Sequence, residues 1–292
     1  MPTVLPYIPE TITVHLGPPN QWAENVTVPF PDYVKNVASS EIYPTWEPAA
    51  IRANVLAIIS FALNRVYTEF YPSRGYDFQI TSSTAYDQKF IRGRDIFENV
   101  SRIVDDIFSD YIRRVGNVEP LAAKFCNGTT VTCEGLSQWG SQELAEAGLS
   151  SVEILRNYYG NDIELVIDAL VGSVKQSYPG TAIRLGDVGE PVFVIQVSLN
   201  RIAQNYPASP KIWPVNGIYD EKTEESVRQF QRIFNLTPDG IVGKATWYKL
   251  VFLYVGVTRL GELVSDGQQY RRVGFQYPGV LRQGDSGEGV RV

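Results

Sequence analysis

The feature that most constrains the fold is a long apolar segment between residues 48 and 66. Its apolar residues recur three and four positions apart, the spacing of one wide helix face, and they are Ile51, Val55, Ile58, Ile59, Ala62, Leu63 and Val66. Pro44 separates this helix from a shorter one that begins near Pro31 and Asp32. Thr45 is expected to cap the start of the long helix. So wide a stripe needs burial, so the sequence predicts a domain built around this helix.

Glu41 lies at the end of the shorter predicted helix, in line with apolar residues. Val34, Val37 and Ala38 precede it at helical spacing. A carboxyl group at the end of a core-facing row loses hydration, so its pKa is expected to rise. A raised pKa suits a general acid near neutral pH. The alternative is a structural acid that pairs with Arg52 or with backbone at the start of the next helix.

The composition narrows the class of partner. The chain has 292 residues and a net charge of −6, with 44% hydrophobic and 20% charged residues, which suits about two globular domains. The negative charge argues against nucleic acid or an anionic lipid surface as partner, and it is compatible with a neutral polymer. No secretion signal and no membrane span are predicted. The sequence carries no prediction of the oligomeric state.

The chain has one histidine and two cysteines, which limits metal chemistry. His15 lies in the alternating stretch of residues 13–16, on its polar side, and multi-histidine metal sites are excluded. Cys126 and Cys133 flank an Asn127-Gly128 turn and are expected to be bridged across a short hairpin or to remain a free pair. Two thiols do not complete a zinc site, so neither a metal nor a cofactor is predicted.

The pattern along the chain predicts two domains of different class. Residues 1–175 are expected to hold strands over 11–16 and 25–30, a helix over 96–111, a helix capped by Ser137 and ended by Gly148, and a strand over 163–171. Residues 176–256 are expected to form three helices joined by glycine-containing turns, one of them capped by Thr223. We therefore expect an α+β domain, mostly helical with short strands, followed by a small all-α domain.

A short internal repeat follows the second domain. Tyr178-Pro179-Gly180 and the glycine-rich residues 184–190 return as Tyr277-Pro278-Gly279 and residues 282–288. Residues 277–292 are therefore expected to open a second copy of the module, with residues 257–276 as a linker. Tandem modules are typical of proteins that bind a repetitive polymer.

Glycines, caps and core positions of the second domain follow the order of a known module. The matching positions are Leu185-Gly186, Gly189, Val194, Gln196, Leu199-Asn200, Asn216-Gly217-Ile218-Tyr219, Thr223, Val227, Phe230-Gln231, Leu236, Asp239-Gly240-Ile241-Val242-Gly243, Thr246-Trp247 and Leu250. They resemble the peptidoglycan-binding domain family of three-helix modules. The resemblance implies peptidoglycan glycan strands as the partner, and it leaves Trp247 mainly a core residue.

Two motifs in the first domain point to a second family. They comprise Tyr33-Val34-Lys35, Ser40-Glu41, Pro44, Trp46 and Pro48, then Ser137-Gln138-Trp139-Gly140, Ala145, Gly148, Ile154-Leu155 and Tyr158-Tyr159. Together they resemble the SpoIID/LytB family. With a peptidoglycan-binding module added, the chain is most similar to clostridial spore cortex-lytic enzymes of the SleC type. Ile59-Ser60 stands where many members have Arg-Thr, and the family's histidine segment is absent near Cys126 and Cys133.

The second resemblance implies a lytic transglycosylase that cleaves the bond between N-acetylmuramic acid and N-acetylglucosamine. Glu41 falls on the family's catalytic glutamate. Ser137 and Gln138 are candidates for lining the glycan groove, and Tyr43 and Tyr86 for aromatic contacts in it. The alternatives are a non-catalytic glycan-binding protein of the wall or spore, or an amidase enhancer. The family implies the spore cortex or the cell wall as the location.

Overall fold

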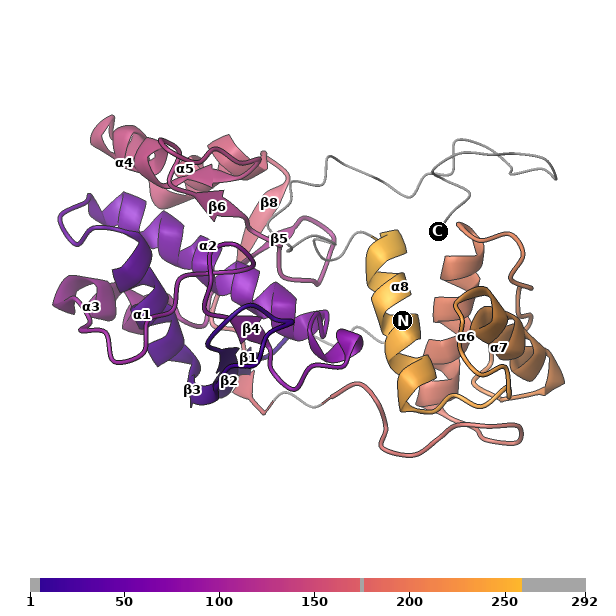
Figure 1. Ribbon diagram of the computed structural model, residues 1–292. Helices are drawn as coiled ribbons and strands as arrows, with labels where there is room; N and C mark the ends of the chain where they lie inside the picture. The colour runs from indigo at the N-terminus through magenta and orange to yellow at the C-terminus, as the bar shows by residue number, and fades with distance from the viewer. Residues whose placement is uncertain (1–5, 174–175, 259–292) are drawn as a thin grey trace. The chain divides into compact units, whose positions relative to one another are not determined.

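The computed structural model describes residues 6–173 and 176–258 (Figure 1). The described chain divides into two compact units, with the division between Gln176 and Ser177. The first unit mixes helices with short strands, and the second is helical. The expected repeat at residues 277–292 and the expected linker from residue 259 onward lie outside the described residues. The first two linker residues, 257 and 258, belong to a helix of the second unit, α8 (Lys244–Thr258).

The first unit contains five helices and nine short strands in its described part. In chain order they are β1 (Ile8–Pro9), β2 (Thr11–His15), β3 (Asn25–Pro29), α1 (Phe30–Glu41), α2 (Pro48–Tyr67), the 3-10 turn η1 (Pro72–Arg74), β4 (Ile80–Thr81), α3 (Glu98–Ile107), β5 (Tyr111–Arg114), β6 (Phe125–Cys126), β7 (Leu136–Ser137), α4 (Gln138–Glu146), α5 (Ser151–Tyr159), β8 (Ile163–Val166) and β9 (Val171–Gly172). The strands form one three-stranded sheet, β3-β2-β4, and three two-stranded pairs, β1-β9, β5-β8 and β6-β7.

Helix α2 is the centre of the first unit. It packs against α1 and α3 and against α4 and α5, as well as β4 and β5 (Figure 1). The segment Pro48–Arg74 is long and apolar enough to cross a membrane, but 89% of its most apolar window is buried inside the protein. This segment is therefore apolar because it lies in the core of the first unit.

The polar side chains of α2 tie it to surrounding segments. The bonds run from Asn54 Nδ2 to Ser141 Oγ (2.8 Å), from the Ile112 N–H to Ser60 Oγ (2.9 Å), from Asn64 Nδ2 to the Pro120 carbonyl (2.8 Å) and from Arg65 Nε to Asp87 Oδ1 (2.8 Å). A polar group buried without a partner costs stability. Each of these bonds therefore fixes where a different segment docks on the helix.

Arg65 and Asp87 form a buried ion pair, with side chains 1% and 0% exposed. Asp87 also accepts hydrogen bonds from Tyr71 Oη (2.5 Å), the Thr81 N–H (2.9 Å) and Thr81 Oγ1 (2.7 Å). The Phe70 ring lies 3.7 Å from the guanidinium carbon of Arg65. The pair therefore anchors the loop of residues 82–90 to α2.

Three predicted boundaries were wrong in this unit. Thr45 does not cap α2. Glu47 is at the N-cap, and Pro48 begins the helix without a side-chain cap bond. Proline is tolerated at this position because the first helical N–H has no partner within the helix. The helix expected over 96–111 ends at Ile107, because Tyr111 and Ile112 pair with β8. The strand expected over 163–171 is two strands, β8 and β9, with Asp168 at φ 53° between them.

His15 is buried, contrary to its predicted place on a polar strand face. It is 5% exposed and stacks on Phe78, with ring centroids 4.5 Å apart. Its Nδ1 lies 2.7 Å from Asn25 Oδ1. An aromatic cluster covers this face of the sheet, so the alternation in β2 does not mark a solvent face, and His15 has a packing role.

The second unit is a three-helix module of α6 (Glu190–Ala203), α7 (Glu221–Ile233) and α8 (Lys244–Thr258). Gln196 Oε1 accepts the Gly217 N–H (2.9 Å), and Gln231 Oε1 accepts the Gly240 N–H (2.9 Å). Both glutamines are buried, so each ties a glycine turn to a helix. The predicted cap by Thr223 was wrong: Asp220 is the N-cap, and its side chain accepts the Thr223 N–H.

Removal of the Asp87 carboxylate is expected to destabilise the first unit by about 3–5 kcal/mol, because Asp87→Ala breaks a buried ion pair by removing one of its members. Urea unfolding measures the loss. Glu98→Ala is the control, because its ion pair with Arg102 is exposed and such pairs contribute at most about 1 kcal/mol. Equal losses in the two variants would contradict the anchoring role of Asp87.

Candidate active site

Glu41 is the last residue of α1, at the corner where the chain turns toward α2. The helix has a buried face that includes Val34, Val37 and Ala38, each 0% exposed. Ile42 follows in an extended conformation, with φ −127° and ψ 166°, and ends the helix. The side chain of Glu41 is partly buried. The core-facing row therefore places the carboxylate at the edge of the core, with access to the surface.

Two donors from distant parts of the chain hold the Glu41 carboxylate. The Lys89 N–H donates to Oε1 (2.9 Å), and Gln138 Nε2 donates to Oε2 (3.3 Å). The alternative pairing with Arg52 was wrong, because Arg52 Nη1 bonds Asp106 Oδ2 (2.6 Å). The backbone donor is also not at the start of α2. Among the described residues, the Glu41 carboxylate thus accepts hydrogen bonds from neutral donors and forms no salt bridge.

The Lys89 donor is fixed by its buried neighbours. Asp87 is anchored on Arg65, and Gln88 donates from Nε2 to the Ile58 carbonyl (3.1 Å). Gln88 Oε1 also accepts Tyr33 Oη (2.8 Å). The loop therefore approaches Glu41 in a defined conformation.

Burial raises the pKa of Glu41 above its ordinary value of 4.5. The loss of hydration outweighs the lowering of the pKa by the Lys89 N–H, the Gln138 amide and the Lys89 charge. No charged group within residues 6–173 and 176–258 forms an ion pair with this carboxylate, so its protonated form is favoured. Glu41 can therefore carry a proton closer to neutral pH than an exposed glutamate.

Ser137 and Gln138 begin α4 but use their side chains differently. Ser137 Oγ accepts the Gly140 N–H (3.0 Å) and is the N-cap. Gln138 is 3% exposed and directs its amide to Glu41. Gly128 packs so closely on Ser137 that a Cβ there would lie 1.8 Å from Ser137 Oγ. Ser137 is therefore covered by the neighbouring loop, and Gln138 is the residue of this pair that contacts Glu41.

That loop is closed by a disulfide between Cys126 and Cys133, whose Cα atoms are 6.1 Å apart. The expected hairpin is absent: Cys126 pairs in parallel with Ser137, and Asn127 Oδ1 accepts N–H groups of the loop, including that of Val131 (2.9 Å). The Asn127 carbonyl accepts the Trp139 N–H (3.2 Å). The disulfide loop therefore supports the start of α4. Residues 6–173 and 176–258 contain no cluster of three or more potential metal ligands of the His, Cys, Asp or Glu type.

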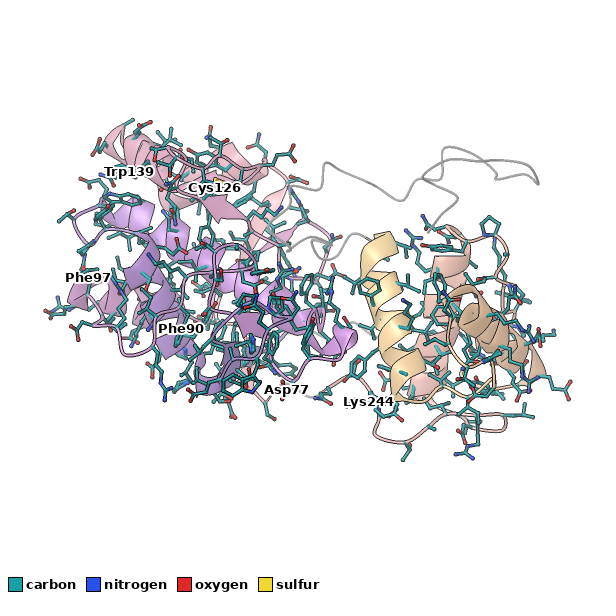
Figure 2. All side chains as sticks on the ribbon, viewed as in Figure 1. Asp77, Phe90, Phe97, Cys126, Trp139 and Lys244 are labelled. Carbon is teal, nitrogen blue, oxygen red and sulfur yellow. A yellow bond between two sulfur atoms is a disulfide. The ribbon has the colours of Figure 1, made fainter. Side chains whose placement is uncertain are left out.

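The two predicted aromatic residues have different surroundings. Tyr43 is 55% exposed, and its ring centroid lies 5.8 Å from that of Trp46 and 5.6 Å from that of Trp139. Figure 2 shows Trp139 and Cys126 in the same part of the first unit, beside α4 and β6. Tyr86 lies in the loop that carries Lys89, and no hydrogen bond or ring contact joins it to Glu41, Tyr43 or Gln138 within the described chain.

Sequence reasoning missed three groups at this corner. The Lys89 N–H is a backbone donor, so no side-chain pattern identifies it. Trp46 and Trp139 belong to the two quoted motifs, but their contact joins positions 93 residues apart, with ring centroids at 5.1 Å. The only available signal was their place next to the predicted site residues in the chain.

The second unit has a separate surface feature. A hollow of about 470 Å³ is lined by residues 179–192, including Arg184, Asp187 and Val188. Val188 is 70% exposed and pairs with Ile218, which is 47% exposed. Trp247 is a core residue, 4% exposed, whereas Trp213 is 78% exposed. This face offers both apolar and charged groups to a ligand.

The comparisons with known proteins bear on the second unit. Residues 188–250 match the family model described as "Putative peptidoglycan binding domain". A comparison with curated proteins finds no match. The second unit is thus a helical peptidoglycan-binding domain, with peptidoglycan as its partner and the cell wall as the place where that partner lies. For the first unit, the SpoIID/LytB family stays a prediction from the sequence motifs.

The raised pKa of Glu41 predicts how stability depends on pH. Between the ordinary pKa of 4.5 and the higher native pKa, the folded state binds more protons than the unfolded state, so stability falls as pH rises through this window. Glu41→Gln removes that fall. The variant is expected to gain stability over the parent protein as pH rises above 4.5, and urea unfolding at a series of pH values measures the difference.

The control for this series is Glu143→Gln, which replaces an exposed glutamate on α4. It measures how much the stability difference changes when a glutamate outside the corner is replaced in the same way. A pH-independent difference for Glu41→Gln would show that the Glu41 pKa is not raised.

Proposed function

We propose that the first unit is a lytic transglycosylase acting on peptidoglycan glycan strands, with Glu41 as its general acid and base. The observation that carries the proposal is the setting of Glu41: a partly buried carboxyl with a raised pKa, held by two neutral donors beside exposed aromatic rings. The peptidoglycan-binding domain in the same chain brings the polymer close to this site.

The chemistry requires only one carboxyl group. Protonated Glu41 gives its proton to the oxygen that joins C1 of N-acetylmuramic acid to N-acetylglucosamine, and the C1–O bond breaks. The C6 hydroxyl oxygen of the muramic acid bonds to C1, and its proton passes to the Glu41 carboxylate. The product is a 1,6-anhydro ring, no water is consumed, and Glu41 regains its proton. Glycosidases that hydrolyse the bond through two carboxyl groups need a second acid at a defined distance.

The neighbouring residues have distinct roles in this scheme. Gln138 orients one carboxylate oxygen and leaves the other to the Lys89 N–H. Tyr43 faces solvent next to the acid and is placed to contact the strand. Ser137 acts by starting α4, so that Gln138 reaches Glu41.

A non-catalytic role is the second candidate, in which the protein binds glycan and assists another enzyme such as an amidase. The observation that favours it is the replacement of the family's usual Arg-Thr by Ile59-Ser60, both of which are buried in α2. Ser60 there accepts the Ile112 N–H and serves the fold.

For the enzyme, the resemblance to SleC-type proteins further suggests the spore cortex as substrate and germination as the stage at which it acts.

Product analysis separates the two candidates. Peptidoglycan from vegetative wall and from spore cortex is incubated with the protein, and the soluble products are analysed by mass spectrometry. We expect 1,6-anhydro-muramic ends from the parent protein and a loss of about 100-fold or more for Glu41→Gln, because the general acid is gone. Glu47→Gln is the matched control, since Glu47 is an exposed acid at the same corner.

Other products would decide against the proposal. New reducing ends in place of anhydro ends would indicate a hydrolase. An absence of new ends with the parent protein would favour the non-catalytic role.

Loss of the Gln138 amide is expected to shift the pH profile of activity. Its hydrogen bond lowers the pKa of Glu41, so Gln138→Met raises that pKa further and keeps the acid protonated to higher pH. The alkaline limb of kcat/KM should move to higher pH. Gln142→Met is the control, because Gln142 is buried on the same helix but accepts the Glu47 N–H (2.8 Å). An unmoved limb in Gln138→Met would exclude the orienting role.

A further inference from the structure

Three aromatic rings cluster near Glu41, and the proposed function gives a role to only one of them, Tyr43. Trp46 and Trp139 meet edge to face, with centroids 5.1 Å apart and planes at 63°. Tyr43 is tilted by 49° against each of the other two rings. We call Tyr43, Trp46 and Trp139 the aromatic corner.

The exposure of the rings is uneven. Trp46 is 7% exposed, whereas Trp139 is 40% exposed and Tyr43 is 55% exposed. Trp46 therefore forms a buried base, and the other two rings present open surface. If the two outer rings served only to cover Trp46, they could do so with less of their own area exposed. Aromatic area in water is unfavourable, so the exposed part of the two rings suggests a further role.

The corner is tied to the acid on both sides. Tyr43 follows Glu41 by two residues, and Trp139 follows Gln138, whose amide bonds Glu41. The Asn127 carbonyl of the disulfide loop holds the Trp139 N–H, so the start of α4 is fixed. Each of the two exposed rings therefore belongs to a residue one or two positions along the chain from Glu41 or from the residue that bonds it.

We propose that the aromatic corner is a sugar-binding subsite, in which Trp139 and Tyr43 stack against a pyranose ring of the glycan strand next to the bond at Glu41. The inference rests on the proposed function, because it takes the strand to be the substrate of this site. A pyranose ring has an apolar face of C–H groups, and a partly exposed indole or phenol ring matches it while its polar edge stays in water.

The chemistry of the occupant follows from the same rings. The three rings are uncharged, and the charged residues nearest to them in the chain segment of residues 41–47 are the acids Glu41 and Glu47, so the corner favours a neutral sugar face over an acidic peptide stem. The tilt between Tyr43 and Trp139 makes an angled surface, which suits a ring held edge-on by one side chain and face-on by the other. We assign the N-acetylhexosamine backbone, and not the peptide cross-link, to this subsite.

Nuclear magnetic resonance of the indole groups tests the subsite without changing it. The chain has five tryptophans, so ¹⁵N-labelled indole should give one signal for each, assigned by single substitutions. The full chain carrying Glu41→Gln, which blocks the proposed cleavage, is titrated with a peptide-free glycan strand of alternating N-acetylglucosamine and N-acetylmuramic acid. We expect the Trp139 and Trp46 signals to shift, and that of Trp22, 97% exposed and outside the corner, to stay in place.

The outcome separates this proposal from the others. If only Trp213 or Trp247 of the second unit shifts, or no signal shifts, the subsite is refuted. The titration does not depend on cleavage, so a shift at Trp139 supports the subsite even if product analysis finds no anhydro ends.

Substitutions supply an independent measurement. Trp139→Ala is expected to weaken strand binding at the first unit by at least about fivefold, while Trp139→Phe retains most of it. Trp22→Ala is the exposed-tryptophan control and should leave binding unchanged. The melting temperature of each variant separates lost contact from lost folding. Equal binding by Trp139→Ala and the parent protein would overturn the proposal.

Discussion

The burial of α2 is the constraint on which the first unit depends. So apolar a helix is stable in water only when other segments cover it. The helices α1, α3, α4 and α5 and the strands β4 and β5 pack around it. Its polar residues then decide which segment docks at which turn, because each needs a partner once it is buried. Asn54 holds α4 and Arg65 holds the loop that reaches Lys89. The two segments that supply donors to Glu41 are thus both tethered to α2.

The candidate acid acquires its properties from this arrangement and not from a charged partner. Hydration is removed by the core row of α1 and by the segments packed beside it, and the donors that replace water are neutral amides. Such donors favour the carboxylate less strongly than a cation does. The balance leaves the pKa of Glu41 raised, and an acid that titrates closer to neutrality is useful for proton transfer to a leaving sugar.

Local sequence patterns predicted the parts of the fold that local chemistry controls. The apolar stripe predicted α2, the Ser137 cap and the Gly148 end predicted α4, and the position of Glu41 at the end of a core row predicted its raised pKa. Patterns could not predict contacts between distant segments. The Lys89 N–H has no side-chain signature, and the burial of His15 depends on Phe78 far along the chain.

The state of the Glu41 carboxyl is the most direct test of this account. Its side-chain carboxyl carbon can be followed by ¹³C nuclear magnetic resonance in the full chain over a pH titration, with Glu41→Gln identifying the signal. We expect a midpoint above 4.5, the ordinary value, and a further rise in Gln138→Met. A midpoint at or below 4.5 would contradict it, because the corner would then hold an ordinary ionised glutamate and not a general acid.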